Sequence, residues 1–322
     1  MATKTSRPLN NFELVEHFLE NALSYDLDSD EKYKIVSKIV ATELNIENFD
    51  ESLISLNSKS YRVSRFRKNR DRKRLHDQIV QELLIEKRLI NDENIKLGVG
   101  GAFPNSNIRT ERNAYIIIGL PASGKSTISN LVADKYGAFI LDSDYAKRKL
   151  PEFEALPFGA TLVHEESDRI IFGEGDPLKF KSLFDYCREE GSNIVLPKIG
   201  SNTEGLITLI KLLRRNSYAV HLTLVELDRI KATKRALTRF EKTGRYVPLG
   251  LIFDTYSNNP TIAFYKLIHN QDSGLESYGI ISTDVKEGNQ PLKIIANKNN
   301  NPANLFKDEQ TKKKKVIRKR II

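Results

Sequence analysis

A phosphate-binding pattern constrains the fold of this chain more than any other sequence feature. The apolar run 114–118 leads into Gly119-x-x-x-x-Gly124-Lys125-Ser126, which is the complete pattern G-x-x-x-x-G-K-[ST]. Its glycines let backbone N–H groups turn toward a polyphosphate, and the following helix adds its positive N-terminal end. The lysine reaches the β- and γ-phosphates, and the serine hydroxyl ligates Mg²⁺. The pattern predicts a nucleoside triphosphate site made of Gly119, Leu120, Pro121, Ala122, Ser123, Gly124, Lys125, Ser126 and Thr127.

Length and composition indicate a soluble chain with a sizeable core. The 322 residues allow about two domains. A hydrophobic share of 39% with 29% charged residues is ordinary for a globular protein. No apolar run has membrane-spanning length, and no secretory signal is visible, so we expect a cytoplasmic protein without a membrane partner. The single cysteine, Cys187, is expected to be a packing residue.

The net charge of +9 is concentrated in two basic clusters. One covers residues 62–74, and the other is the tail 312–320. Either could contact a nucleic-acid backbone. A solvated helix face and a frayed terminus are the simpler interpretations, and we favour them because the phosphate-binding pattern already accounts for an anionic ligand.

The hydrophobic periodicity divides the chain into three parts. Helical patterns cover 10–23, a stretch beginning at Ser29, a short piece at 53–56 and a long stretch at 64–90. No strand pattern appears there, and a turn-rich linker follows at 98–107. We therefore predict a small all-α domain at 1–105, a kinase-like domain at 106–295 and a polar, mobile, Lys/Arg-rich tail at 296–322.

Alternating short apolar runs and helical stretches after residue 114 predict an α/β fold, a P-loop kinase-like parallel sheet flanked by helices. The expected strands are 115–118, 138–141, 194–196, 221–227 and 279–282. The expected helices are 125–136, 161–172, 178–190, 204–215, 229–242 and about 261–269, the third of them after the cap pair Asp176-Pro177.

Two carboxylates follow the second predicted strand. Asp142 and Asp144 stand at its C-terminal end, where ligands gather in an open parallel sheet. A carboxylate there can accept a proton from an attacking hydroxyl or hold Mg²⁺. We favour Asp144 for this role over Asp142, although a helix N-cap at Ser143 or Asp144 is the simpler structural alternative.

Later segments favour a small-molecule kinase over motor or signalling NTPases. The strand segments at 193–197 and 221–226 do not end in an hhhhDE pattern, and the sequence has no Asn-Lys-x-Asp guanine selector. Instead, Arg239 and Arg245 flank Gly244, where a helix is expected to end. Cations on such a hinge can close over a phosphoryl group and exclude water. Two surface arginines on a basic protein are the alternative.

Residues 114–248, somewhat under half of the chain, resemble the zeta toxin family, the kinase toxins of epsilon–zeta toxin–antitoxin systems. The resemblance implies that Lys125 and Ser126 bind ATP and Mg²⁺, and that Asp144 is the base. It also implies that the arginines of Arg239-Phe-Glu and Arg245-Tyr-Val-Pro clamp phosphate.

The resemblance further implies a substrate. The family phosphorylates the sugar 3′-hydroxyl of UDP-N-acetylglucosamine, which blocks cell-wall precursor synthesis, and Glu165 or Glu166 matches its substrate-side helix. Where many members have Val-Ile-Glu-Gly-Thr-Gly-Arg, this chain places Pro197 and Ser201 at the glutamate and arginine positions. A related sugar nucleotide therefore remains open as the acceptor.

The resemblance also suggests a role for the helical N-terminal part. In the family a separate three-helix antitoxin blocks the ATP site, so the fused helical part is expected to inhibit in cis. Two rival functions remain open, a polynucleotide or nucleoside kinase and a nucleotide-dependent nucleic-acid-binding module. The set of Lys125, Asp144, Arg239 and Arg245 weighs against a pure binding module, because binding requires no base.

Overall fold

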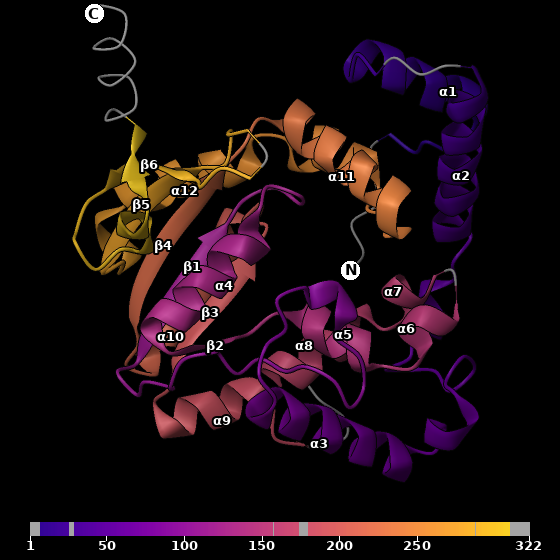
Figure 1. The fold of residues 1–322 in the computed structure, drawn as a ribbon. Helices are drawn as coiled ribbons and strands as arrows, with labels where there is room; N and C mark the ends of the chain where they lie inside the picture. Colours follow the sequence, from indigo (N-terminus) through magenta and orange to yellow (C-terminus); the bar gives the residue numbers. More distant parts are fainter. Residues whose placement is uncertain (1–6, 26–28, 157, 174–179, 287, 310–322) are drawn as a thin grey trace, which may run out of the picture. The chain divides into compact units, whose positions relative to one another are not determined.

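The computed structural model describes residues 7–25, 29–156, 158–173, 180–286 and 288–309 (Figure 1). They contain a seven-stranded, mostly parallel sheet with the strand order β2-β3-β1-β4-β5-β6-β7. Helices flank the strands, and a helical region precedes the first strand. The predicted fold class, a P-loop kinase-like α/β fold after a helical region, is confirmed.

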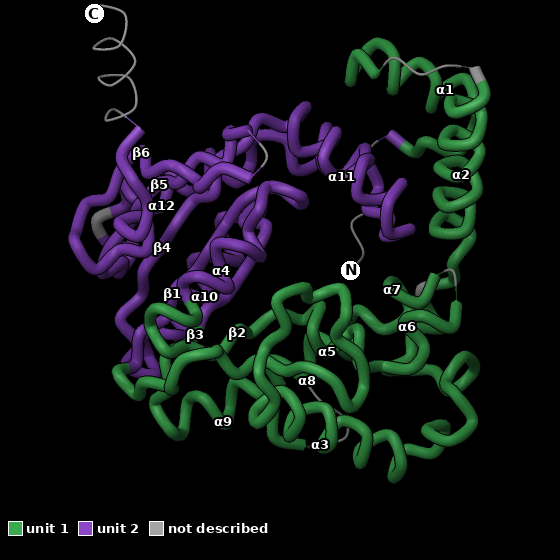
Figure 2. Tube along the Cα trace, viewed as in Figure 1, with its two compact units in different colours: residues 1–4, 8–111, 133–194 green, residues 5–7, 112–132, 195–322 purple. Residues whose placement is uncertain are grey.

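The described residues group into two compact units (Figure 2). Unit 1 contains the described residues of 8–111 and 133–194, and unit 2 contains Arg7 with those of 112–132 and 195–309. The boundary predicted near residue 105 lies inside unit 1. The division into a helical domain, a kinase domain and a tail stays a prediction.

The centre of unit 2 is a parallel ladder of three apolar strands. β1 (Asn113–Ile118) pairs with β4 (Ala219–Glu226), and β4 pairs with β5 (Ser277–Ser282). The register aligns Ile116 with Leu222, and both side chains are buried. Near-continuous apolar runs of this kind are typical of strands covered on both faces, which is why the sequence predicted all three.

The two strands at the β7 edge of the sheet were not predicted. β6 (Leu292–Ala296) pairs antiparallel with β5, and β7 (Lys307–Asp308) pairs parallel with β6. β6 is only partly buried and β7 has two residues, so neither carries a strong periodic signal. The two remaining strands, β2 (Ala138–Ile140) and β3 (Asn193–Lys198), agree with the prediction within one or two residues.

The helices of unit 2 begin and end close to their predicted positions. They are α4 (Lys125–Tyr136, its last turn in unit 1), α10 (Thr203–Arg215), α11 (Arg229–Thr243) and α12 (Asn259–His269). Asn202 caps α10 and Asp228 caps α11 through side-chain oxygens that accept backbone N–H groups. An unpredicted π-helical turn covers Leu251–Tyr256.

Among the N-terminal helices of unit 1, the second agrees with the prediction and the others are shorter than predicted. α1 (Phe12–His17) runs into a π-helical turn, Phe18–Ala22, and α2 covers Ser29–Glu47. The long helix predicted at 64–90 is a 3₁₀ turn followed by α3 (Asn69–Ile85). The piece expected at 53–56 is a 3₁₀ turn at Glu51–Leu53.

The later helices of unit 1 differ more from the prediction. α5 (Ser143–Lys149) and α6 (Glu152–Ala155) were not predicted, and the helix expected at 161–172 is divided into α7 (Gly159–Leu162) and α8 (His164–Phe172). α9 (Leu183–Glu190) begins at a capping box of Ser182 and Asp185. The predicted cap Asp176-Pro177 lies outside the described residues.

The turn-rich segment expected to be a linker is packed into unit 1. Ala102 is fully buried, its N–H donates to the carbonyl of Leu83 on α3, and its carbonyl accepts from Ile140 of β2. A Cβ on Gly101 would lie 2.3 Å from the carbonyl oxygen of Glu86, so only glycine fits there. The segment joins α3 to the edge strand.

Residues after 296 were expected to be a mobile tail. Within unit 2, however, the 3₁₀ turn Pro302–Leu305 has buried side chains and β7 pairs with β6. Asn301 is fully buried, where its amide donates to the carbonyl of Leu222 and the hydroxyl of Ser277. Because asparagine is polar and commonly exposed, the sequence pattern does not reveal that this side chain is buried and hydrogen-bonded to strand residues. The Lys-rich run 312–320 lies outside the described residues.

The structure bears on two expectations from composition, the one about membrane-spanning segments and the one about Cys187. Among the described residues, no helix is long and apolar enough to cross a membrane. Cys187 on α9 is buried, and burial raises the pKa of its thiol well above the usual range, as expected of a packing residue.

Candidate functional site

The predicted phosphate cradle lies in unit 2, where β1 ends. Gly119 and Gly124 have φ angles of 158° and 91°, and a Cβ on Gly119 would lie 2.6 Å from the carbonyl oxygen of Val225. Both positions therefore require glycine. Lys125, the first residue of α4, donates from Nζ to the carbonyls of Gly119 and Leu120 at 2.8 and 2.6 Å. Its ammonium thus lies over the loop that would cradle the phosphates.

The cradle offers a hydroxyl suited to Mg²⁺. Ser126 and Thr127 are exposed in the first turn of α4. Within the described part of the chain, no group of three or more His, Cys, Asp or Glu side chains is placed to hold a metal ion by itself. Mg²⁺ commonly takes one or two protein ligands together with substrate phosphates and waters, so the Ser126 hydroxyl fits such a role.

Thr283, which the sequence analysis missed, supports the cradle from the end of β5. Its hydroxyl donates to the carbonyl of Ser123 at 2.7 Å, and Arg235 Nη2 on α11 donates to the Thr283 carbonyl at 2.8 Å. Ser123 and Thr283 are both buried. The available signal was the position of Thr283 at the carboxyl end of a predicted parallel strand, where ligand-site residues gather.

Replacing Thr283 by Val should weaken ATP binding without unfolding the protein. The substitution keeps the side-chain volume but leaves the buried Ser123 carbonyl without its hydroxyl donor, which costs about 1 kcal/mol, or roughly fivefold in Kd. Isothermal titration with ATP measures the change, and Thr283→Ser, which retains the hydroxyl, should bind nearly as well as the unchanged protein. Equal affinity for all three proteins would contradict this support role.

The two predicted arginines occur together at the end of α11, also in unit 2. The helix ends where expected, at Gly244, whose φ of 72° suits glycine. The Thr243 hydroxyl donates to the Arg239 carbonyl at 2.8 Å and accepts from the Arg245 N–H at 3.3 Å. Phe240 packs edge-on against Tyr246. These contacts fix the turn that carries both guanidinium groups.

The candidate base lies in unit 1, in the first turn of α5. The side chain of Asp142 accepts the Asp144 N–H at 3.0 Å and so caps the helix. This gives Asp142 a structural role, and the N-cap falls on it and not on Ser143 or Asp144. Asp144 is part-exposed and lies 3.0 Å from Lys147 Nζ. The hydrogen bond to Asp142 thus fixes the backbone at Asp144, and the Asp144 carboxylate is partly accessible to solvent.

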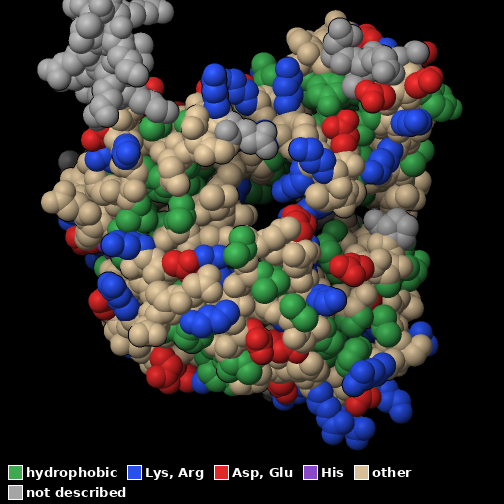
Figure 3. All heavy atoms as spheres, in the orientation of Figure 1, with side chains coloured by type: hydrophobic (Ala, Val, Ile, Leu, Met, Phe, Trp, Pro, Cys, Tyr) green, Lys and Arg blue, Asp and Glu red, His purple; other side chains and the backbone are tan. Residues whose placement is uncertain are grey.

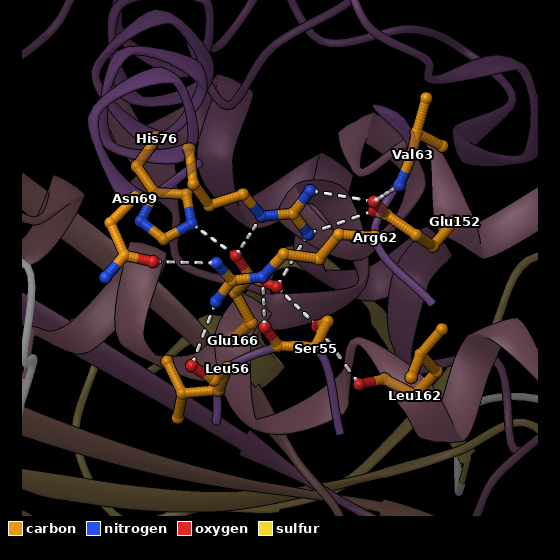
Figure 4. Close-up of polar contacts among 10 residues, drawn as sticks. Ser55, Leu56, Arg62, Val63, Asn69, His76, Glu152, Leu162 and Glu166 are labelled. Carbon is orange, nitrogen blue, oxygen red and sulfur yellow. Dashed lines mark hydrogen bonds and ion pairs between the residues drawn. The ribbon is translucent and has the colours of Figure 1, made fainter. Parts of the chain in front are cut away.

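Glu166, named from sequence as a substrate carboxylate, is instead the centre of a buried ionic cluster (Figure 4). Arg72 of α3 donates to it from Nε and Nη2 at 2.5 and 2.7 Å, His76 Nε2 lies 2.5 Å away, and the Ser55 hydroxyl bonds the second oxygen. Arg72 also forms a fork with Glu152 at 2.8 and 2.9 Å. Glu166 on α8 is 1% exposed, so we leave it out of the proposed substrate site.

The other predicted glutamate and the basic cluster also lie in unit 1. Glu165 is part-exposed in the first turn of α8 and stays a candidate. Arg62 is buried and donates to the carbonyls of Ser55 and Leu56. Lys and Arg side chains still gather over the first turns of α3 (Figure 3), and the exposed members are Arg65, Arg67, Lys68, Arg70 and Arg74.

The buried cluster should make stability depend on acidity. Burial alone would raise the pKa of Glu166, but its bonds to Arg72 and His76 outweigh burial and hold the pKa far below the ordinary value of 4.5. A carboxyl with a depressed folded-state pKa contributes its full stability above the unfolded pKa and loses it as the pH falls below.

Unfolding measured in urea between pH 7 and pH 3 should therefore show a loss of stability that begins near pH 4.5. Glu166→Gln should be less stable than the unchanged protein at pH 7, with a smaller further loss in acid. Parallel pH profiles for the two proteins would contradict the role of the cluster.

A comparison with protein-family models agrees with the sequence resemblance. The family model described as Zeta toxin matches residues 104–267, just over half of the chain. A structure from the PezAT chromosomal toxin–antitoxin system of the human pathogen Streptococcus pneumoniae is 19% identical, covering 67% of this chain and 88% of that chain, with a TM-score of 0.44. The AvrRxo1-ORF1:-ORF2 complex with ATP is 18% identical, covering 77% and 72%, with a TM-score of 0.45.

A comparison with curated proteins found no match. The two structures are too distant from this chain in sequence and in fold to support a family assignment, which therefore rests on the family model alone. That model includes the cradle, both candidate arginines and Asp144. This chain belongs to the zeta toxin family.

Proposed function

We propose that this protein is an ATP-dependent kinase that phosphorylates a hydroxyl of a UDP-amino sugar, UDP-N-acetylglucosamine in the first instance. The observation that carries the proposal is the cradle. A strand-to-helix loop with two obligatory glycines carries a lysine ammonium over its carbonyls, in a chain of the zeta toxin family. Such loops bind the phosphates of nucleoside triphosphates.

The proposed reaction divides the work among four side chains. Lys125 binds the β- and γ-phosphates, and Asp144 accepts the proton of the acceptor hydroxyl. Arg239 and Arg245 offset the negative charge that spreads over the transferred phosphoryl group. Mg²⁺, held by the Ser126 hydroxyl and the phosphates, would neutralise further charge. Phosphoryl transfer needs little covalent chemistry from the protein, so orientation and electrostatics supply most of the rate.

A consequence for the cell follows from this activity. Phosphorylation of the sugar hydroxyl would consume a precursor of the cell wall and make the protein a toxin to its producer. Control by an antitoxin, or by the helical N-terminal part in cis, fits such an activity. Deleting residues 1–48, which removes α1 and α2, should raise activity if that part inhibits. Unchanged activity of a folded deletion variant would contradict inhibition in cis.

Competition between acceptors tests the proposal against its rival kinase functions. The full chain is incubated with ATP labelled on the γ-phosphate, together with UDP-N-acetylglucosamine, nucleosides and oligonucleotide ends in equal amounts. We expect label on the sugar nucleotide. Label on oligonucleotides or nucleosides would support the polynucleotide or nucleoside kinase instead. ATP-dependent nucleic-acid binding with a steep salt dependence and no labelled product would support the binding module.

A further inference from the structure

Helix α5, which carries Asp144, is attached through its side chains to residues that precede the family match. The Tyr145 hydroxyl donates to Asp92 Oδ1 at 3.0 Å. Arg148 Nη2 lies 2.6 Å from Glu93 Oε2, and both arginine and tyrosine are buried. Burial and the nearby negative charge of Asp92 raise the pKa of Tyr145, which keeps the phenol protonated as a donor.

The last residue of α5 has the most enclosed attachment. Lys149 Nζ lies 2.7 Å from Glu82 Oε2 on α3 and 3.1 Å from the carbonyl oxygen of Lys96. The lysine side chain is fully buried. A buried ammonium is stable only when an opposite charge and hydrogen-bond acceptors surround it, so Glu82 determines where this end of α5 can lie.

The first residue of α5 is attached to α8. Ser143 Oγ bonds the carboxylate of Asp168, and α8 is itself fixed by the bonds between Glu166 and Arg72. Arg72 also precedes the family match, which begins at residue 104. Both ends of α5 therefore depend on residues between 72 and 99.

A helix of this length needs such attachments. α5 has seven residues, and isolated helices shorter than about 12 residues are marginal in water. Its position is set by tertiary contacts, and the hydrogen-bonded and ionic contacts of Tyr145, Arg148 and Lys149 come from α3 and the segment after it. A small displacement of α5 would move the Asp144 carboxylate, and misplacing a reacting group by about 1 Å can cost 10²-fold in rate.

We propose that Glu82, Asp92 and Glu93, which we call the α5 anchor, are positioning residues of the kinase site. The segment between Arg72 and Val99 is then a working part of the catalytic domain. This inference rests on the proposed function in one respect, the role of Asp144 as the base. The proposal divides the region before the family match into two parts. α1 and α2 form the part proposed to inhibit, and the α5 anchor belongs to the part required for activity.

Charge reversal across one anchor pair tests the proposal in the full chain. Glu93→Arg should lower kcat about tenfold to a hundredfold, leave the Kd for ATP unchanged and speed amide exchange across α5 with no change in α4. The double variant Glu93→Arg with Arg148→Glu restores the pair with its charges exchanged, so it should recover much of both losses. Glu189→Arg, at an exposed ion pair with Lys181 in the same unit, is the matched control and should change neither quantity.

The background of Asp144→Asn shows whether the anchor acts through Asp144. If it does, adding Glu93→Arg to Asp144→Asn should cause little further loss of kcat. Unchanged exchange across α5 in Glu93→Arg, or a full additional loss in the Asp144→Asn background, would overturn the proposal. If the unchanged protein transfers phosphate to no acceptor, the proposed function fails, and the exchange data alone decide whether the anchor holds α5.

Discussion

Asp144→Asn should lower turnover by about 10²–10⁴-fold, because a positioned general base contributes an acceleration of that size. The amide keeps the shape of the side chain but cannot take the proton of the acceptor hydroxyl. ATP binding should be largely unaffected, since Asp144 is not one of the cradle residues and the amide removes only its ability to take a proton. Turnover is measured with saturating ATP and acceptor, and ATP affinity by titration.

Asp142→Asn is the matched control for this substitution. Asp142 caps α5 by accepting the Asp144 N–H, and asparagine caps helices about as well as aspartate. The control should therefore retain most of the activity. Undiminished product formation by Asp144→Asn, or equal losses in the two variants, would remove Asp144 from the role of base.

Arg72→Met should lower the free energy of unfolding by about 3–5 kcal/mol, the usual cost of removing one partner from a buried ion pair. Arg72 is fully buried and contacts Glu152 and Glu166, whose side chains are buried as well. Without the guanidinium, two carboxylates would remain in the interior without the arginine that is hydrogen-bonded to both of them. Urea unfolding at pH 7 measures the loss.

Two further variants show whether the cause is charge. Arg70→Met lies two residues earlier on α3, where the arginine side chain is 75% exposed, and should have little effect. Adding Glu152→Gln and Glu166→Gln to Arg72→Met removes the unbalanced charges and should restore part of the stability. A small loss for Arg72→Met, comparable to that of Arg70→Met, would contradict the importance of the cluster.

The features that sequence predicted best are those with local causes. The cradle follows from eight consecutive residues, and β1, β4 and β5 follow from short apolar runs. α11 and its end at Gly244 follow from helical periodicity and a glycine that takes positive φ. In each case the structure-determining information lies within one element.

The features that sequence missed depend on partners far along the chain. Glu166 was matched to a substrate-side helix by the family resemblance, and its ionic role was missed because its counterion, Arg72, is 94 residues away. The contact of Thr283 with Ser123 joins residues 160 apart. α5 is short and polar, and each of its anchoring carboxylates lies more than 50 residues before the α5 residue that it binds, so periodicity alone could not reveal the helix. One sequence cannot show which of its charged residues will meet.

The family resemblance gives the least support to one part of the proposal, the identity of the phosphate acceptor. At the end of β3 this chain has Pro197 and Ser201 at the positions where the sequence resemblance implies a glutamate and an arginine. A Cβ on Gly200 would lie 2.8 Å from the side chain of Ile118, so the loop backbone is tightly constrained there. An acceptor that requires those two missing side chains would bind poorly, which makes a panel of sugar nucleotides necessary.

The central claim is that phosphate moves from ATP to a UDP-amino sugar. The most direct measurement is mass spectrometry of UDP-N-acetylglucosamine and related sugar nucleotides after incubation with the protein, ATP and Mg²⁺. We expect a mass gain of one phosphate on a UDP-amino sugar, abolished by Lys125→Ala and strongly reduced by Asp144→Asn. Unmodified sugar nucleotides after prolonged incubation with protein shown to bind ATP would contradict the claim.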